Sequence, residues 1–222
     1  MSMLADLEQA SGQTFPPLFR QLVEGNRFSW GEQGPNWYRT VFPQVQPQPP
    51  VLLYANDYEP IEPSELRAAW EDLTAEDHYN PLRDDLKLLP FARTGAGDHY
   101  CFWTNAPGSS ESPVLLVWHD DDRADLLAAN FQDFLFRKMA EAVVELEEED
   151  SLLSEGDIGT NLQAWLGTHR GWLRGDQVAA LQALYARVED ITAGEISDED
   201  VQPLLQLITF DGIDSEMPYV QA

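Results

Sequence analysis

The sequence predicts an α+β fold, with a single, mainly antiparallel curved sheet packed with helices, plus an acidic helical C-terminal extension. Short aromatic and β-branched runs separated by Gly-rich turns fill the centre of the chain, which is typical of an antiparallel meander. Apolar residues at helical spacing lie on either side of that centre. The chain has 222 residues, of which 43% are hydrophobic and 11% aromatic, so it can bury a core without disulfides.

Two helices, a connector and a strand are expected in the first half of the chain. Residues 15–26 predict a helix, because apolar residues recur every three or four positions, prolines suit the first turn and Gly25 suits the end. Four prolines within residues 43–50 predict an extended connector. The apolar run 51–55 is a candidate buried strand, and residues 63–70 predict a helix with proline and acid in its first turn.

Three strands and a long helix are expected in the centre. The strand candidates are residues 87–92, 99–103 and 114–118. Residues 94–98, Thr-Gly-Ala-Gly-Asp, predict a hairpin turn and not a phosphate-binding loop, because they lead into a strand and lack the Lys-Ser/Thr of a P-loop. Residues 131–146 place their apolar side chains on one face of a helix.

The last third of the chain is more acidic than the rest. Residues 1–140 hold 21 acidic and 10 basic side chains, whereas residues 141–222 hold 18 and 3, which gives net charges of −11 and −15. We therefore expect a main domain over residues 1–145 and an acidic, mainly helical extension over residues 146–222.

Three helices are expected in this extension. Residues 161–166 fit a short helix, and residues 176–188 fit a longer one that Asp176 would cap. Residues 197–200 have the spacing of a capping box, but Pro203 favours a start near Asp200 for the last helix. The final segment, residues 211–216, lacks the ligand spacing of a calcium loop and is expected to be an acidic tail.

The charge of the whole chain restricts its partners. With 39 acidic and 13 basic side chains, the formal net charge is −26. Such a surface repels nucleic acid and anionic membranes, so the expected partners are cations, metal ions or basic proteins. The sequence shows no secretory signal and no run of about 18 apolar residues that could cross a membrane, so we expect a cytoplasmic protein.

The run His119-Asp120-Asp121-Asp122 follows a predicted strand and allows two interpretations. An imidazole with carboxylates can ligate a hard or borderline cation. The run can also be a solvated acidic loop that caps a helix starting near Ala124. The second interpretation is favoured, because the spacing matches no metal-ligand pattern, and no metal site is predicted.

No motif for catalysis is present in the sequence. There is no Gly-x-Ser-x-Gly elbow, and Cys101 lies in an apolar aromatic run where a thiol is usually buried and inert. The four histidines are scattered, so none has an evident partner for acid–base work. We expect neither an enzyme nor a cofactor.

The acidic run 145–150 also has two interpretations. It can be a solvated helix end or linker, which is the simpler one. It can also be an electrostatic landing site for a basic partner protein.

Several of these features, taken in order, resemble the SUKH superfamily, which includes fungal cell-wall regulators and many bacterial immunity proteins. The shared order is a Pro-initiated helix ending in Gly-Asn, then Leu-Pro-Phe-Ala, a Gly-x-Gly-Asp turn, a Pro-Val strand into His-Asp-Asp, and an Ala-x-x-Phe-x-x-Phe-Leu helix. These motifs occupy residues 15–26, 89–92, 95–98, 113–121 and 128–135, and the resemblance covers about residues 14–140. The two turns are expected to be fold determinants.

The resemblance implies a bacterial immunity protein that binds a cognate polymorphic or contact-delivered toxin stoichiometrically, and the negative charge suggests a basic toxin, with a nuclease as one candidate. The alternative is a non-enzymatic regulatory scaffold that binds an endogenous protein. The oligomeric state stays open. The predicted partner-binding residues are Asp120, Asp121, Asp122, Glu147, Glu148 and Glu149.

Overall fold

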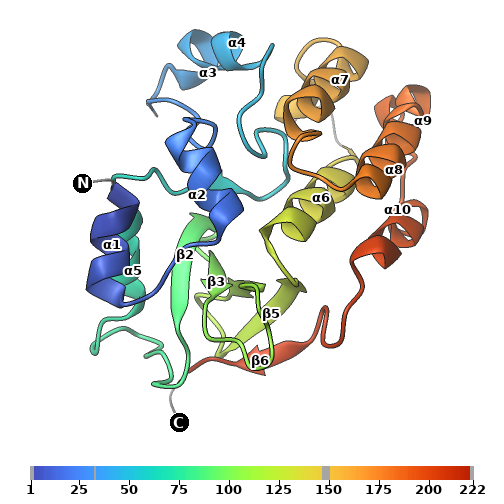
Figure 1. Cartoon of the computed structure of the whole chain (residues 1–222). Coiled ribbons are helices and arrows are strands. Elements are labelled where there is room, and N and C mark those ends of the chain that lie inside the picture. The colour runs from blue at the N-terminus through green and yellow to red at the C-terminus, as the bar shows by residue number, and fades with distance from the viewer. Residues whose placement is uncertain (1–2, 33, 147–150, 221–222) are drawn as a thin grey trace. The chain divides into compact units, whose positions relative to one another are not determined.

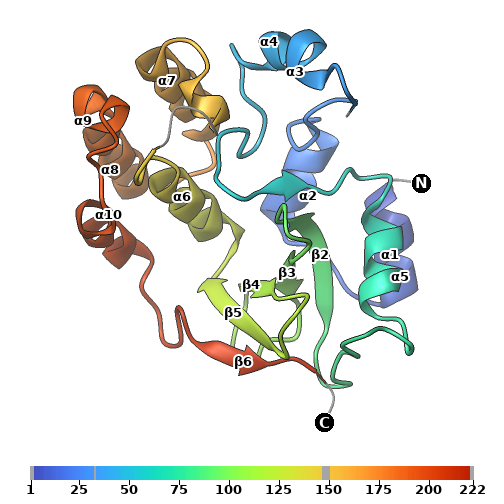
Figure 2. The ribbon, with the colours of Figure 1, turned by 180° about the vertical axis from the view of Figure 1, so that it is seen from behind.

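The computed structural model describes residues 3–32, 34–146 and 151–220, which form two compact units (Figures 1 and 2). The sheet unit contains residues 1–28, 57–134 and 210–222, and the helical unit contains residues 29–56 and 135–209. The expected division into a main domain over residues 1–145 and an extension after it remains a prediction. The two compact units are a different kind of division, because each is built from segments that alternate along the chain. No helix in the described ranges is both long enough and apolar enough to cross a membrane.

The sheet unit contains a six-stranded antiparallel sheet in which every strand lies beside its neighbours in sequence, so the predicted α+β fold is confirmed. A register shift between Pro90 and Ala92 lets a proline occupy an inner strand. The strands are β1 Glu59–Pro60, β2 Leu88–Arg93, β3 His99–Trp103, β4 Val114–Val117, β5 Arg123–Ala128 and β6 Glu216–Pro218.

Three helices and the start of a fourth belong to the sheet unit. They are α1 Met3–Ser11, α2 Pro17–Glu24, α5 Leu66–Leu73 and α6 Phe131–Glu141, which continues into the helical unit. Helices α1 and α5 lie side by side in both views (Figures 1 and 2). Helix α1 has no counterpart among the predicted elements, and it buries Leu4 and Leu7.

Aromatic side chains form the core between the helices and one face of the sheet. Phe19 of α2 lies within 6 Å of the rings of Phe91, Phe102 and Phe131, and Phe91 stacks on Phe102 at 4.3 Å between centroids. A second apolar cluster contains Cys101, which is fully buried as predicted, and burial raises the pKa of its thiol. The helix predicted over residues 15–26 and the three central strands are therefore present, with ends shifted by a few residues.

Two elements of the sheet unit differ from the predictions. The helix expected near Ala124 is instead β5, because residues 123–128 alternate between exposed and buried positions and pair with β4. Residues 211–216 are not a free acidic tail, because a turn leads there into β6, which pairs with β5 (Figure 2).

The helical unit contains the remaining helices and no strand among its described residues, so the expected helical character of the extension is observed there. Asp157 caps α7 by accepting a 2.7 Å hydrogen bond from Thr160 N. The helices are α3 Trp37–Thr40, α4 Phe42–Val45, α7 Ile158–His169, α8 Gly175–Tyr185, α9 Val188–Thr192 and α10 Asp198–Leu205, with 3-10 turns η1 Leu152–Ser154 and η2 Gln206–Ile208.

Two predicted helix starts in the helical unit were wrong. Asp176 lies inside the first turn of α8, whose cap position is Arg174. Helix α10 begins at Asp198 despite Pro203, because Asp200 accepts hydrogen bonds from the backbone and hydroxyl of Ser197 and fixes the first turn.

The segment before β1 is neither the strand nor the extended connector that was predicted. Residues 51–54 form buried consecutive turns, and Leu52 has a positive φ of 54°. The Leu52 amide donates to Nε2 of His169 at 3.2 Å, and Nδ1 of this fully buried ring lies 2.9 Å from Trp165 O. The buried imidazole therefore replaces the backbone partner that a strand would supply.

Candidate functional site

The candidate site is the turn between β4 and β5, residues 118–122, in the sheet unit. All five of its side chains are exposed, and they include Asp120, Asp121 and Asp122. The indole of Trp118 is 36% exposed and its Nε1 donates to Asp125 at 3.1 Å. The structure therefore brings the first three predicted partner-binding residues together on one exposed turn.

Two side chains from distant parts of the sequence hold the backbone of this turn. Asn80 Nδ2 lies 3.1 Å from His119 O and 3.0 Å from Asp121 O. The buried Tyr219 hydroxyl donates to Trp118 O at 2.6 Å and lies 3.2 Å from Asn80 Nδ2. Because these carbonyl groups are bonded from within the fold, the backbone that carries the exposed carboxylates is held in place.

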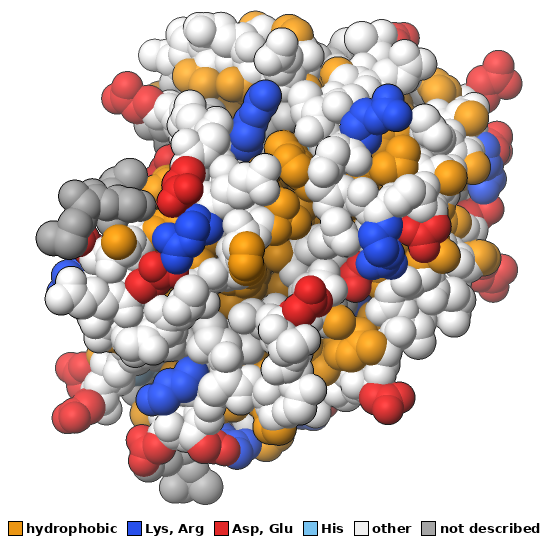
Figure 3. Space-filling view, in the orientation of Figure 1, with side chains coloured by type: hydrophobic (Ala, Val, Ile, Leu, Met, Phe, Trp, Pro, Cys, Tyr) orange, Lys and Arg blue, Asp and Glu red, His pale blue; other side chains and the backbone are white. Residues whose placement is uncertain are grey.

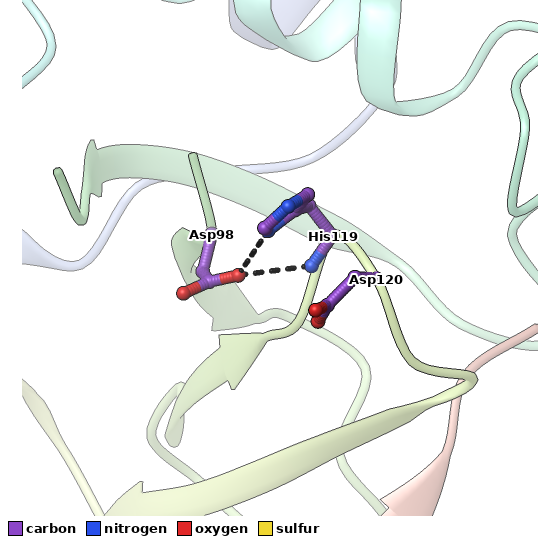
Figure 4. Close-up of side chains that lie close together, drawn as sticks. All are labelled: Asp98, His119 and Asp120. Carbon is purple, nitrogen blue, oxygen red and sulfur yellow. Dashed lines mark hydrogen bonds and ion pairs between the residues drawn. The ribbon is translucent and has the colours of Figure 1, made fainter. Parts of the chain in front are cut away.

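Asp98 connects this turn to the Gly-x-Gly-Asp turn (Figure 4). Its carboxylate accepts hydrogen bonds from His119 N at 3.0 Å and from His119 Nδ1 at 2.7 Å. It also accepts a hydrogen bond from Thr94 Oγ1 at 2.9 Å. The side chain is almost fully buried, and Gly97 before it has a φ of +106°, which favours glycine. The two family motifs thus bond to each other, as expected of fold determinants.

The same contacts shift the pKa values of both partners. Burial raises the pKa of the Asp98 carboxyl, but the hydrogen bonds from His119 and Thr94 outweigh burial and leave it below its usual value. The hydrogen bond to Asp98 raises the pKa of His119, and the charge of Asp120 raises it further. The strength of the Asp98–His119 interaction, which holds the turn, therefore depends on pH.

Asp98, His119 and Asp120 are also the described residues whose ligand atoms come close enough to hold a metal ion, within 4.8 Å of one another. In this structure, however, the imidazole Nδ1 and an Asp98 oxygen already bond to each other at 2.7 Å. Asp98 and His119 therefore form a hydrogen-bonded pair, and the absence of a metal site stays a prediction.

Tyr79 lies next in sequence to Asn80 and is the most exposed large apolar side chain among the described residues, at 87%. Because Asn80 bonds directly to the turn, the backbone of Tyr79 lies close to it. We call Tyr79, Trp118, Asp120, Asp121 and Asp122 the acidic–aromatic surface. Tyr79, Asn80 and Tyr219 carry no sequence signal for this role, because the fold joins them across about 140 residues.

The negative charge of this surface is only partly compensated. Arg123 forms ion pairs with Asp121 at 3.5 Å, with Asp122 at 3.8 Å and with Glu216 of β6. Arg123 thus faces several carboxylates. Glu147, Glu148 and Glu149, the other predicted partner-binding residues, lie outside the described residues.

Comparison with known proteins gives one family. The SMI1 / KNR4 family (SUKH-1) matches residues 2–137, which is more than half of the chain and includes the acidic–aromatic surface. Searches of curated proteins and of solved structures each found no significant match. The matched range contains both hydrogen-bonded turns, and on these grounds the chain belongs to the SMI1 / KNR4 family (SUKH-1).

Proposed function

We propose that this protein is a bacterial immunity protein that binds a cognate contact-delivered toxin and blocks it by stoichiometric occlusion. The family is one of immunity and regulatory proteins, which supports a protein partner. The observation that carries the proposal is the acidic–aromatic surface, where exposed Tyr79 and Trp118 accompany three aspartates on a turn fixed by Asn80 and Tyr219.

This composition suits a basic partner. Tyrosine and tryptophan are enriched among the residues that dominate binding energy, and both rings attract Lys and Arg side chains. The surrounding carboxylates accelerate the encounter with a basic surface, such as that of a nuclease. The fixed turn lowers the ordering cost of association, because its carbonyl groups are already bonded within the fold.

Binding, and not catalysis, is proposed for this surface. His119, in the same turn, is occupied by Asp98, and the Cys101 thiol is fully buried. The family is not typically enzymatic, which supports the same conclusion. Glu147, Glu148 and Glu149 remain a proposed second contact for the same basic partner.

Co-expression with the toxin domain encoded beside this gene tests the proposal. The wild-type chain is expected to restore growth and to form a one-to-one complex whose association slows steeply as salt rises. Changing Tyr79→Ala should weaken binding by about 2 kcal/mol, the scale of an interface hot spot, whereas Tyr38→Ala, an exposed tyrosine of the helical unit, should leave it unchanged.

The charge contribution is tested by a triple change of Asp120, Asp121 and Asp122 to Asn, which should slow association about tenfold at low salt. The matched control removes three exposed acids of the helical unit, Glu32, Glu189 and Glu195, as Gln. Failure of every neighbouring toxin to be neutralised would refute the immunity function. Recovery of an endogenous protein as the stoichiometric partner would then support the regulatory scaffold.

A further inference from the structure

A half-open groove of about 310 Å³ lies between α7 and α8 in the helical unit. The lining residues from α7 recur every three or four positions and so share one face of that helix, and those from α8 do the same. The family match ends at residue 137, so the groove lies outside the matched range. The lining residues are Gln163, Leu166, Gly167, Arg170, Gln182, Tyr185 and Ala186.

The floor of the groove is apolar, and the residues in its middle have a small side chain or none. Leu166 and Tyr185 are largely buried there, and the Tyr185 hydroxyl donates to Met139 O at 2.8 Å, which fixes the ring. Gly167 and Ala186 are exposed, and a Cβ built on Gly167 meets no described atom within 4 Å. A third helix can therefore approach both helix backbones closely.

The polar side chains at the rim of the groove have hydrogen-bonding groups that the described part of the chain does not use. Within the described part of the chain, the side chains of Arg170, Gln163 and Gln182 have no hydrogen bond or ion pair. By contrast, the nearby arginines in sequence are paired, Arg174 with Asp176 at 3.5 Å and Arg187 with Asp200 at 2.6 Å. On the face shown in Figure 3, Lys and Arg side chains are scattered and several lie beside Asp or Glu.

An unpaired guanidinium beside an apolar groove is complementary to a carboxylate on an apolar surface. Arg can bind a carboxylate through two parallel hydrogen bonds, and the free glutamine amides can add donors. We propose that the α7–α8 groove binds an amphipathic helical segment of the partner protein, with apolar side chains over Gly167 and Ala186 and an aspartate or glutamate paired with Arg170. This inference rests on the proposed partner-binding function and adds a second contact of opposite charge preference.

The test is a selection with displayed 16-residue helices on the intact chain. The helices carry varied apolar residues at positions i, i+3, i+4 and i+7, and Asp, Glu, Gln, Lys or Arg beside them. Enriched helices are expected to carry an acidic residue at one edge. Their affinity should fall at least tenfold for Gly167→Leu, which fills the groove and favours the helix, and stay unchanged for Gly171→Leu, a second glycine with open space.

A charge reversal completes the design. Arg170→Glu should abolish binding of the acidic helices and recover binding when their acid is changed to Arg. No enrichment, enrichment of basic helices alone, or equal affinity for the Gly167→Leu variant would overturn the proposal. Because the selection contains no toxin, its failure is distinct from a failure of toxin neutralisation.

Discussion

The two units of the molecule differ in how they carry charge. Counted by unit, the sheet unit holds 23 acidic and 7 basic side chains and the helical unit holds 16 and 6, which gives net charges of −16 and −10. Counted along the chain, the last third had appeared to be the more acidic part. The difference arises because β6 and its acidic turn join the sheet unit while residues 29–56 join the helical unit.

The two units also use different buried side chains to hold their loops. In the sheet unit, the buried carboxylate of Asp98 holds the turn that carries His119. In the helical unit, the buried imidazole of His169 holds the turn that carries Leu52. Hydrogen bonds to a charged group contribute more to stability than neutral ones, so loss of the Asp98 carboxylate should cost more than loss of the His169 imidazole.

The largest effect is expected for Asp98→Ala. It leaves His119 N and Thr94 Oγ1 without their acceptor, so the free energy of unfolding should fall by roughly 3 kcal/mol. Urea denaturation measures the change, and the exposed Asp120→Ala should shift stability by less than about 0.5 kcal/mol. Equal stability of the two variants would show that Asp98 is not an anchor.

A smaller loss is expected for His169→Phe in the helical unit. An aromatic ring remains in place of the imidazole, but the Leu52 amide loses its buried acceptor, which should cost about 2 kcal/mol. Hydrogen exchange reports the change directly, because the Leu52 amide should exchange quickly in the variant and slowly in the wild type. Unchanged protection of that amide would contradict the assignment.

Tyr219→Phe should lower the free energy of unfolding by about 1 kcal/mol, since it removes one hydroxyl that bonds to Trp118 O and Asn80. Tyr79→Phe is the control for stability alone, because its side chain is exposed. If the turn is held as described, Tyr219→Phe should also weaken partner binding. A loss of stability without any loss of binding would separate the fold from the acidic–aromatic surface.

The smallest effect concerns pH. Because Asp98 raises the pKa of His119 in the folded state, this histidine contributes stability that is fully present below its unfolded pKa of about 6.5 and is lost as pH rises through the higher folded value. His119→Gln should remove that decline. Unfolding measured at intervals from pH 5.5 upward checks this, and parallel curves for the two proteins would contradict it.

Local sequence patterns were sufficient for the central strands of the sheet and insufficient for β5 and β6. Strands β2, β3 and β4 follow aromatic and β-branched runs, and turn chemistry placed the loop before His99. Residues 124–129, Ala-Asp-Leu-Leu-Ala-Ala, have the composition of a helix, but pairing with β4 decides their conformation. Strand β6 is too short, at Glu216–Pro218, to show any periodicity.

The candidate site was predictable only where it is continuous in sequence. Asp120, Asp121 and Asp122 are adjacent, so the acidic turn was evident. Tyr79 is assigned to the site because its neighbour Asn80 bonds to the turn. Asn80 also bonds to Tyr219, which is 139 positions away in the sequence. Such contacts are set by strand order, which no residue spacing encodes. The α7–α8 groove likewise depends on how two helices pack.

The bond between Asn80 and Tyr219 also bears on the order in which the protein folds. These residues are 139 positions apart, and residues 135–209 of the helical unit are synthesised between them. Contacts of such separation form late, because the intervening chain must first be closed into a loop. On the ribosome, the acidic turn would thus emerge long before the residue that fixes it, and a nascent chain would not yet present a finished surface to its partner.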